Sequence, residues 1–107
     1  MINETTAPEI LPEILEAEWD HGQVMALFDD LSRGAEVSHV QVRSNNSNRP
    51  QDQRTTLDQA SELFRNRAAK AIQIQYRFDG QAWCDTLMVG EHTTKIIRTR
   101  STYEGAG

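Results

Sequence analysis

The chain has 107 residues, a single cysteine and a net charge of −5, which fits one domain without an internal disulfide. The negative charge disfavours unspecific binding to nucleic acid or to anionic membranes. No apolar stretch approaches the roughly 20 residues that cross a bilayer, and the N-terminus lacks the pattern of a signal peptide, so we expect a cytoplasmic protein.

Charge is distributed unevenly along the chain. Residues 1–36 hold nine acids against one base, and residues 37–107 hold ten bases against seven acids. We interpret this as acidic helices that complement a mildly basic sheet within one fold. A basic surface that meets an acidic or nucleic-acid partner is the alternative.

A polar tail is expected at residues 1–8, followed by a short helix over about 12–18. Pro12 is compatible with the first turn of a helix. Apolar residues recur every four positions in this segment, as they do along one side of a helix: Leu11, Leu15 and Trp19.

A second helix is predicted over residues 21–33. Asp20 and Gln23 have the spacing of a capping box, and Gly34 stands where a glycine commonly ends a helix. Four apolar residues follow the pattern of one helical face: Val24, Leu27, Phe28 and Leu31.

The middle of the chain predicts a strand, a loop and a third helix. Residues 37–43 are typical of a strand, and the wholly polar run 44–53 predicts a loop. Thr56 and Gln59 repeat the capping-box spacing, which places a helix start here. Its apolar face is expected to carry Leu57, Ala60, Phe64 and Ala68.

Residues 71–89 predict a β-hairpin, the strongest local signal in the chain. Two runs of alternating apolar and polar residues flank Asp79 and Gly80, and this dipeptide favours a two-residue turn. Such a turn places Tyr76 directly opposite Trp83, an aromatic cross-strand pair.

A last strand is predicted over 95–102, before a loose tail at 104–107. If the turn at 90–91 also has two residues, Ile96 lies opposite Asp85. We therefore predict one α+β domain at residues 9–103, with about four strands in a mainly antiparallel sheet and two to three helices packed on one face. The order is helix, helix, strand, helix, strand, strand, strand.

Four side chains are expected to form a polar cluster on the core face of the hairpin: Tyr76, Trp83, Asp85 and Arg98. A buried carboxylate needs a partner, and an ion pair between Asp85 and Arg98 is the usual solution. The structural interpretation is an ion pair at the rim of the sheet, with the Arg98 stem across Trp83. The functional alternative is a small-ligand or catalytic site centred on Asp85.

The opposite face of the hairpin is expected to be a mixed surface that could bind a partner. Its candidate residues are Gln73, Gln75, Arg77, Cys84 and Ile97. No residue pattern predicts a cofactor, a metal site or a catalytic residue, because the three histidines are far apart in the sequence and the single thiol lies in mid-strand.

We therefore expect a non-enzymatic protein-interaction or accessory module, which could form a homodimer through its sheet. A sheet platform for single-stranded nucleic acid is an alternative, because Tyr76, Phe78 and Trp83 lie near several arginines. That alternative requires these aromatic rings to be free of the helices. The Asp85 site is the second alternative.

Overall fold

The computed structural model describes residues 14–44 and 52–100, and its fold is a six-stranded sheet with two helices. The elements are β1 (Ile14–Trp19), α2 (His21–Gly34), β2 (Glu36–Ser44), β3 (Asp52–Arg54), α3 (Leu57–Arg65), β4 (Ala69–Phe78), β5 (Gln81–Val89) and β6 (Thr94–Arg100). The tails expected at 1–8 and 104–107 lie outside the described residues.

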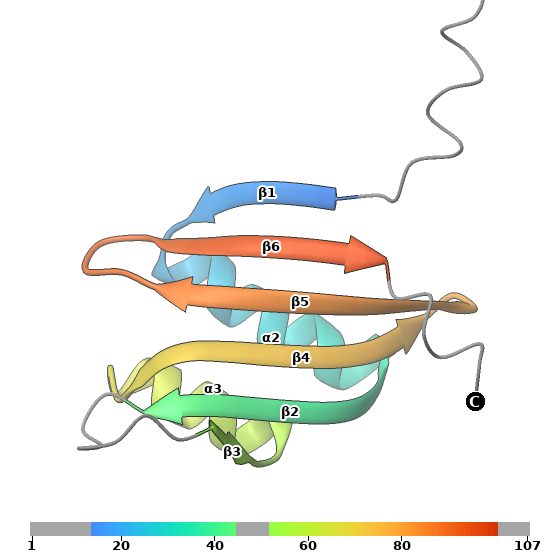
Figure 1. Ribbon diagram of the computed structural model, residues 1–107, viewed down its shortest axis with the longest axis horizontal. Coiled ribbons are helices and arrows are strands. Elements are labelled where there is room, and N and C mark those ends of the chain that lie inside the picture. The colour runs from blue at the N-terminus through green and yellow to red at the C-terminus, as the bar shows by residue number, and fades with distance from the viewer. Residues whose placement is uncertain (1–13, 45–51, 101–107) are drawn as a thin grey trace, which may run out of the picture.

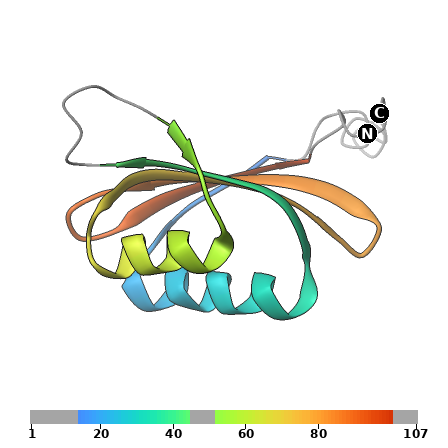
Figure 2. The same ribbon diagram turned by 90° about the horizontal axis from the view of Figure 1, so that it is seen from below.

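The strands follow the order β1-β6-β5-β4-β2-β3, and every neighbouring pair is antiparallel (Figure 1). Both helices lie on the same face of this sheet (Figure 2). The other face, which points toward the viewer in Figure 1, is covered by no element of the described residues. We call it the open face.

The predicted fold class was wrong, because residues 14–44 and 52–100 form a sheet of six strands, not about four, with two helices packed against it. The described part of the segment predicted as a helix over 12–18 belongs to strand β1, which pairs with β6. Leu15 and Trp19 are four residues apart, and an even spacing also places two residues on one face of a strand. Glu16 and Glu18 then point to the opposite face, so the pattern fits a strand as well as a helix.

The loop predicted over 44–53 was also partly wrong. Ser44 belongs to β2, and Asp52–Arg54 forms β3, a short edge strand that pairs with β2. The rest of the predicted loop lies outside the described residues. A strand of three polar residues carries no hydrophobic alternation by which the sequence could reveal it.

Both capped helices begin where their caps were predicted, but their ends differ: Gly34 is the last residue of α2, and α3 ends at Arg65, so Ala68 lies beyond it. In α2 the Asp20 carboxylate accepts a hydrogen bond from the Gln23 backbone N–H at 2.9 Å, and the Gln23 side chain accepts one from the Asp20 N–H at 3.0 Å. The Thr56 hydroxyl accepts from the Gln59 N–H at 3.1 Å at the start of α3. The apolar faces of the two helices and of the sheet enclose the core. Among the residues that the structure describes, no helix is both long enough and apolar enough to cross a membrane.

The register of the first hairpin is confirmed: Tyr76 lies opposite Trp83, and the two strands meet at a two-residue turn. Asp79 and Gly80 have φ angles of 54° and 79°, as a type I′ turn requires. This register fixes which side chains of β4 and β5 share each face.

The second turn was predicted wrongly, because β5 and β6 are joined by four residues rather than two. The Gly90 N–H donates to the Thr93 carbonyl at 2.9 Å, and a Cβ atom on Gly90 would lie 2.7 Å from that oxygen. Glycine is therefore favoured at this position, because the backbone of the four-residue loop passes too close to leave room for a side chain. The register shifts by two residues, so Asp85 faces Arg98 instead of Ile96 and each residue keeps its face.

Candidate functional site

The polar cluster on the helix-covered face is centred on Asp85, which is 0% exposed. Arg98 donates two hydrogen bonds to it, from Nε to Oδ1 at 2.9 Å and from Nη2 to Oδ2 at 2.8 Å. The Tyr76 hydroxyl donates to the same carboxylate, at 3.1 and 3.2 Å from its two oxygens. Neighbouring strands supply the three residues, since β5 lies between β4 and β6.

In this arrangement Arg98 neutralises the charge of the buried carboxylate, and both of its oxygens accept hydrogen bonds. Burial raises the pKa of Tyr76, as does the charge of Asp85, so the phenol stays neutral and able to donate. Hydrogen bonding to Asp85 raises the pKa of Arg98. Among the described residues, no buried side-chain nitrogen or oxygen lacks a hydrogen-bond partner, so the cluster leaves no unsatisfied polar atom for a ligand.

Trp83, the fourth predicted member of the cluster, lies on the same face but opposite Arg100 rather than Arg98. It is half-buried against the core. The structure therefore brings Tyr76, Asp85 and Arg98 into contact, and Trp83 lies opposite Tyr76 and packs against the core.

The structure brings the five candidate interaction residues together on the open face. Gln75 lies opposite Cys84 on the neighbouring strand. Gln73 lies opposite Thr86, which in turn lies opposite Ile97 on β6. Arg77 extends the same face toward the hairpin turn. Gln73, Cys84 and Ile97 are half-buried even though no helix covers them.

Next to these residues the open face has a depression of about 260 Å³. Its lining comes from β2, β4 and β5: Gln41, Arg43, Ala71, Ile72, Gln73, Thr86 and Met88. Ala71 contributes a small side chain to this lining, whereas Met88, its partner on β5, is 49% exposed. Sequence reasoning missed the part that β2 plays here, because the strand order could not be read from the chain.

The thiol of Cys84 is not activated as a nucleophile. Its pKa is raised by burial, and the negative charge of Asp85 raises it further. The thiolate is the reactive form, so this position disfavours covalent catalysis.

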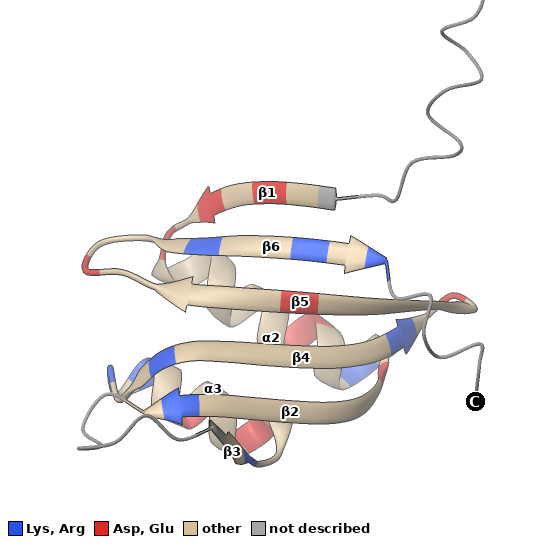
Figure 3. Cartoon of the chain, viewed as in Figure 1, with Lys and Arg blue, Asp and Glu red and all other residues tan. Residues whose placement is uncertain are grey.

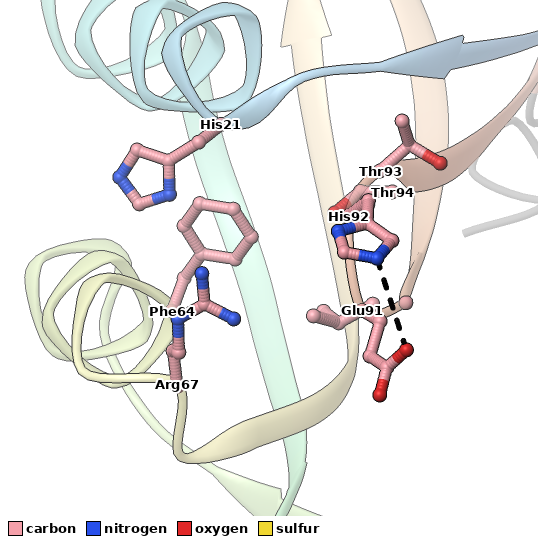
Figure 4. Close-up of a pocket in the computed structure, with 9 residues that line it drawn as sticks. His21, Phe64, Arg67, Glu91, His92, Thr93 and Thr94 are labelled. Atoms are coloured by element: carbon pink, nitrogen blue, oxygen red, sulfur yellow. Dashed lines mark ion pairs between the residues drawn. The ribbon is translucent and has the colours of Figure 1, made fainter.

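A second, smaller pocket of about 40 Å³ lies where α2 begins and α3 ends (Figure 4). His21 and Phe64 stack on one side of it, with ring centroids 5.0 Å apart. On the other side His92 lies 3.9 Å from the Glu91 carboxylate, and both side chains are exposed. The fold thus brings together two histidines that are distant in sequence.

That pocket does not form a metal site. Within residues 14–44 and 52–100, no group of three or more histidine, cysteine or acidic side chains is placed to hold a metal ion. The pocket's volume suits a water molecule or a small ion rather than an organic substrate.

No protein-family model matches the chain, and no curated protein or solved structure matches it.

Proposed function

We propose that the chain is a non-enzymatic interaction module that binds a protein partner through the open face of its sheet. The observation that carries the proposal is the placement of both helices on one face (Figure 2). The face left uncovered has half-buried, uncharged side chains at its centre: Cys84, Thr86, Ile97, Ala71 and Gln73.

A solvent-facing sheet surface is common in antiparallel proteins and would not by itself indicate binding. What supports binding is the distribution of charge over this face. The described charged residues that the register places on this face lie on β1 and β3 and toward the ends of β2, β4 and β6 (Figure 3): Glu16, Glu18, Arg54, Glu36, Arg43, Arg77 and Lys95. A centre depleted in charge and surrounded by a charged rim is the composition of protein interfaces.

The two alternative functions have less support from the geometry. A ligand site at Asp85 would need a free carboxylate, and this one is bound by Arg98 and Tyr76. A stacking platform for nucleic acid would need exposed aromatic rings, but Tyr76 is 5% exposed and Trp83 is half-buried on the helix side. Among the three aromatic residues of the hairpin, only Phe78 is largely exposed, at 53%.

The proposal is tested by replacing Thr86 with a photo-crosslinking amino acid in the organism that encodes the chain. Irradiation should join the chain to a protein, because Thr86 lies at the centre of the open face. Ala26, on the exposed side of α2, is the matched control position. Equal yields of adduct at the two positions would contradict the proposal. Fractionation of the same cells tests the cytoplasmic location, which stays a prediction.

A further inference from the structure

We infer that the pocket where α2 begins and α3 ends binds a phosphate group, either as the free ion or as part of a phosphate monoester. This goes beyond the proposed function, because residues of both helices line the pocket and the helices lie on the face of the sheet opposite the open face (Figures 2 and 4). Three features of the pocket carry the inference: the backbone conformation of Arg67, the surrounding hydrogen-bond donors, and the size.

Arg67 follows α3 in a backbone conformation that favours glycine. Its φ is 60°, and its N–H donates to the Phe64 carbonyl at 3.0 Å, while the N–H of Ala68 donates to the Leu63 carbonyl at 2.8 Å. These two hydrogen bonds form a Schellman motif, in which the position of Arg67 is usually occupied by glycine because a Cβ atom is unfavourable at positive φ. An arginine at this position therefore lowers the stability of the helix end.

The stability of α3 does not explain why an arginine stands there. A cation near the C-terminus of a helix is favourable, but Arg65 already supplies one from within the last turn of α3. The other described non-glycine residue with a positive φ is Asp79, which occupies a turn that favours aspartate. Strained residues that persist in a fold are concentrated at functional sites, so we expect the Arg67 side chain to bind a ligand.

The hydrogen-bond donors around the pocket suit an oxyanion. The Arg67 guanidinium is planar and matches two oxygens of a phosphate group. His21 and His92 lie on opposite sides of the pocket (Figure 4), and an imidazole ring carries at least one N–H in either protonation state. Because His21 is the first residue of α2, the positive end of the helix dipole also lies at the pocket.

The pocket has the size of a phosphate group. Its volume is about 40 Å³, which corresponds to roughly three water molecules. On the side formed by the loop between β5 and β6, the Glu91 and His92 side chains are 90% and 91% exposed. The pocket is therefore open to water on this side, and the remainder of a phosphate monoester has room to extend into solvent.

Nearby acids oppose the binding of an anion. Glu91 lines the pocket, but its carboxylate lies 3.9 Å from His92 and its exposure allows salt to screen the charge. Two further acids, Glu18 and Asp20, stand next to the pocket and already accept hydrogen bonds within the chain. We therefore expect weak binding, with a dissociation constant in the millimolar range.

Titration of the isotope-labelled chain with inorganic phosphate, followed by NMR, tests the inference. At an ionic strength held constant with chloride, the amide signals of the loop between β5 and β6 and of the first turn of α2 should shift and saturate. Arg67→Gln should weaken binding about tenfold. Arg65→Gln is the matched control, because it removes the same charge from an exposed position of α3 that does not line the pocket, and it should bind like the natural chain.

Arg67→Gly separates binding from folding. Glycine relieves the strain at positive φ, so this variant should have a higher urea midpoint than the natural chain while it loses phosphate binding. A lower midpoint would show that the arginine stabilises the helix end, which would account for its presence without a ligand and overturn the inference.

Glu91→Gln tests the sign of the ligand's charge. Removal of the negative charge should tighten phosphate binding, and weaker binding would contradict a site for an anion. Separate titrations with inorganic phosphate and methyl phosphate distinguish the two sources, since the tighter ligand shows whether the pocket takes the free ion or the monoester. Shifts that do not saturate, or that Arg67→Gln and Arg65→Gln reduce equally, would indicate an adventitious ion only and overturn the site.

Discussion

Asp85 and Arg98 lie directly opposite one another on β5 and β6 and share two hydrogen bonds, although only the carboxylate is fully buried. The Arg98 side chain is 28% exposed, so its outer edge reaches water while its inner edge is bound. A planar guanidinium matches a carboxylate in this two-bond geometry. The pair therefore specifies the register of β5 and β6, because a one-residue slip would turn the two side chains to opposite faces.

Removal of Arg98 should destabilise the fold strongly. Arg98→Met leaves the buried Asp85 carboxylate without its cation, and we expect a loss of about 2–4 kcal/mol in the free energy of unfolding. We expect a smaller loss than the roughly 3–5 kcal/mol for a fully buried pair, because water can reach the exposed edge of Arg98. Urea denaturation at neutral pH measures it.

The double variant Asp85→Leu, Arg98→Met is the control for that measurement. Loss of both partners removes the uncompensated charge along with the ion pair, so the double variant should be more stable than Arg98→Met alone. A double variant that is less stable than Arg98→Met would show that the pair contributes net stability and that burial of the charge is not the main penalty.

The Tyr76 hydroxyl should stabilise the fold at neutral pH and less so in alkaline solution. Tyr76→Phe removes its hydrogen bond to Asp85, which should cost about 1–2 kcal/mol. Because the pKa of Tyr76 is raised in the folded state, the neutral phenol is favoured there. Its stabilisation is complete below the ordinary tyrosine pKa of about 10 and is lost as the pH rises above that value.

The natural chain and Tyr76→Phe should therefore differ most near neutrality and converge above about pH 10. Urea midpoints of both chains across this pH range provide the measurement. A constant difference between them would mean that Tyr76 ionises equally in the folded and unfolded states.

Sequence reasoning succeeded where two independent local signals agreed. The α2 helix combines a capping box at Asp20 with one apolar face, and the hairpin combines alternation with Asp79 and Gly80, whose positive φ angles a turn requires. Asp85 and Arg98 were also placed correctly on one face. The predicted register of β5 and β6 was wrong by two residues, and a shift of two residues leaves each side chain on its face.

Other features depend on contacts that no local pattern encodes. The spacing of Leu15 and Trp19 fits a helix and a strand equally, and only the pairing of β1 with β6 decides between them. The depression at Ala71 arises because β2 lies beside β4, a neighbour across a long connection. The sequence shows which residues share the open face. Their side chains include no reactive group, so their chemistry does not indicate which partner would bind there.

Trp83→Ala tests the assignment of that ring to the helix-covered face. Trp83 packs against the core while part of its ring stays in water, so truncation should cost about 2–4 kcal/mol, toward the lower end of the range for buried aromatic residues. Chemical denaturation measures this loss. An unchanged midpoint would place the ring on the surface and revive the stacking-platform hypothesis for single-stranded nucleic acid.

Two glycine substitutions should change stability in opposite directions. Gly80 has a φ of 79° and open space around its Cβ position, so Gly80→Ala should destabilise by about 1 kcal/mol through backbone strain alone. Gly22 lies in the first turn of α2 without a positive φ, and Gly22→Ala should stabilise by about 0.5 kcal/mol. Thermal denaturation of the pair provides a matched comparison. Equal effects of the two substitutions would argue against the type I′ turn.

Cys84 should react slowly in the folded chain, and its reactivity also reports on the open face. Burial raises the pKa of the thiol, so less thiolate is present near neutral pH than in the unfolded chain. Alkylation by iodoacetamide, followed by mass spectrometry, should accelerate in urea and with rising pH. A folded chain that reacts as fast as the unfolded one would show that Cys84 is neither buried nor covered.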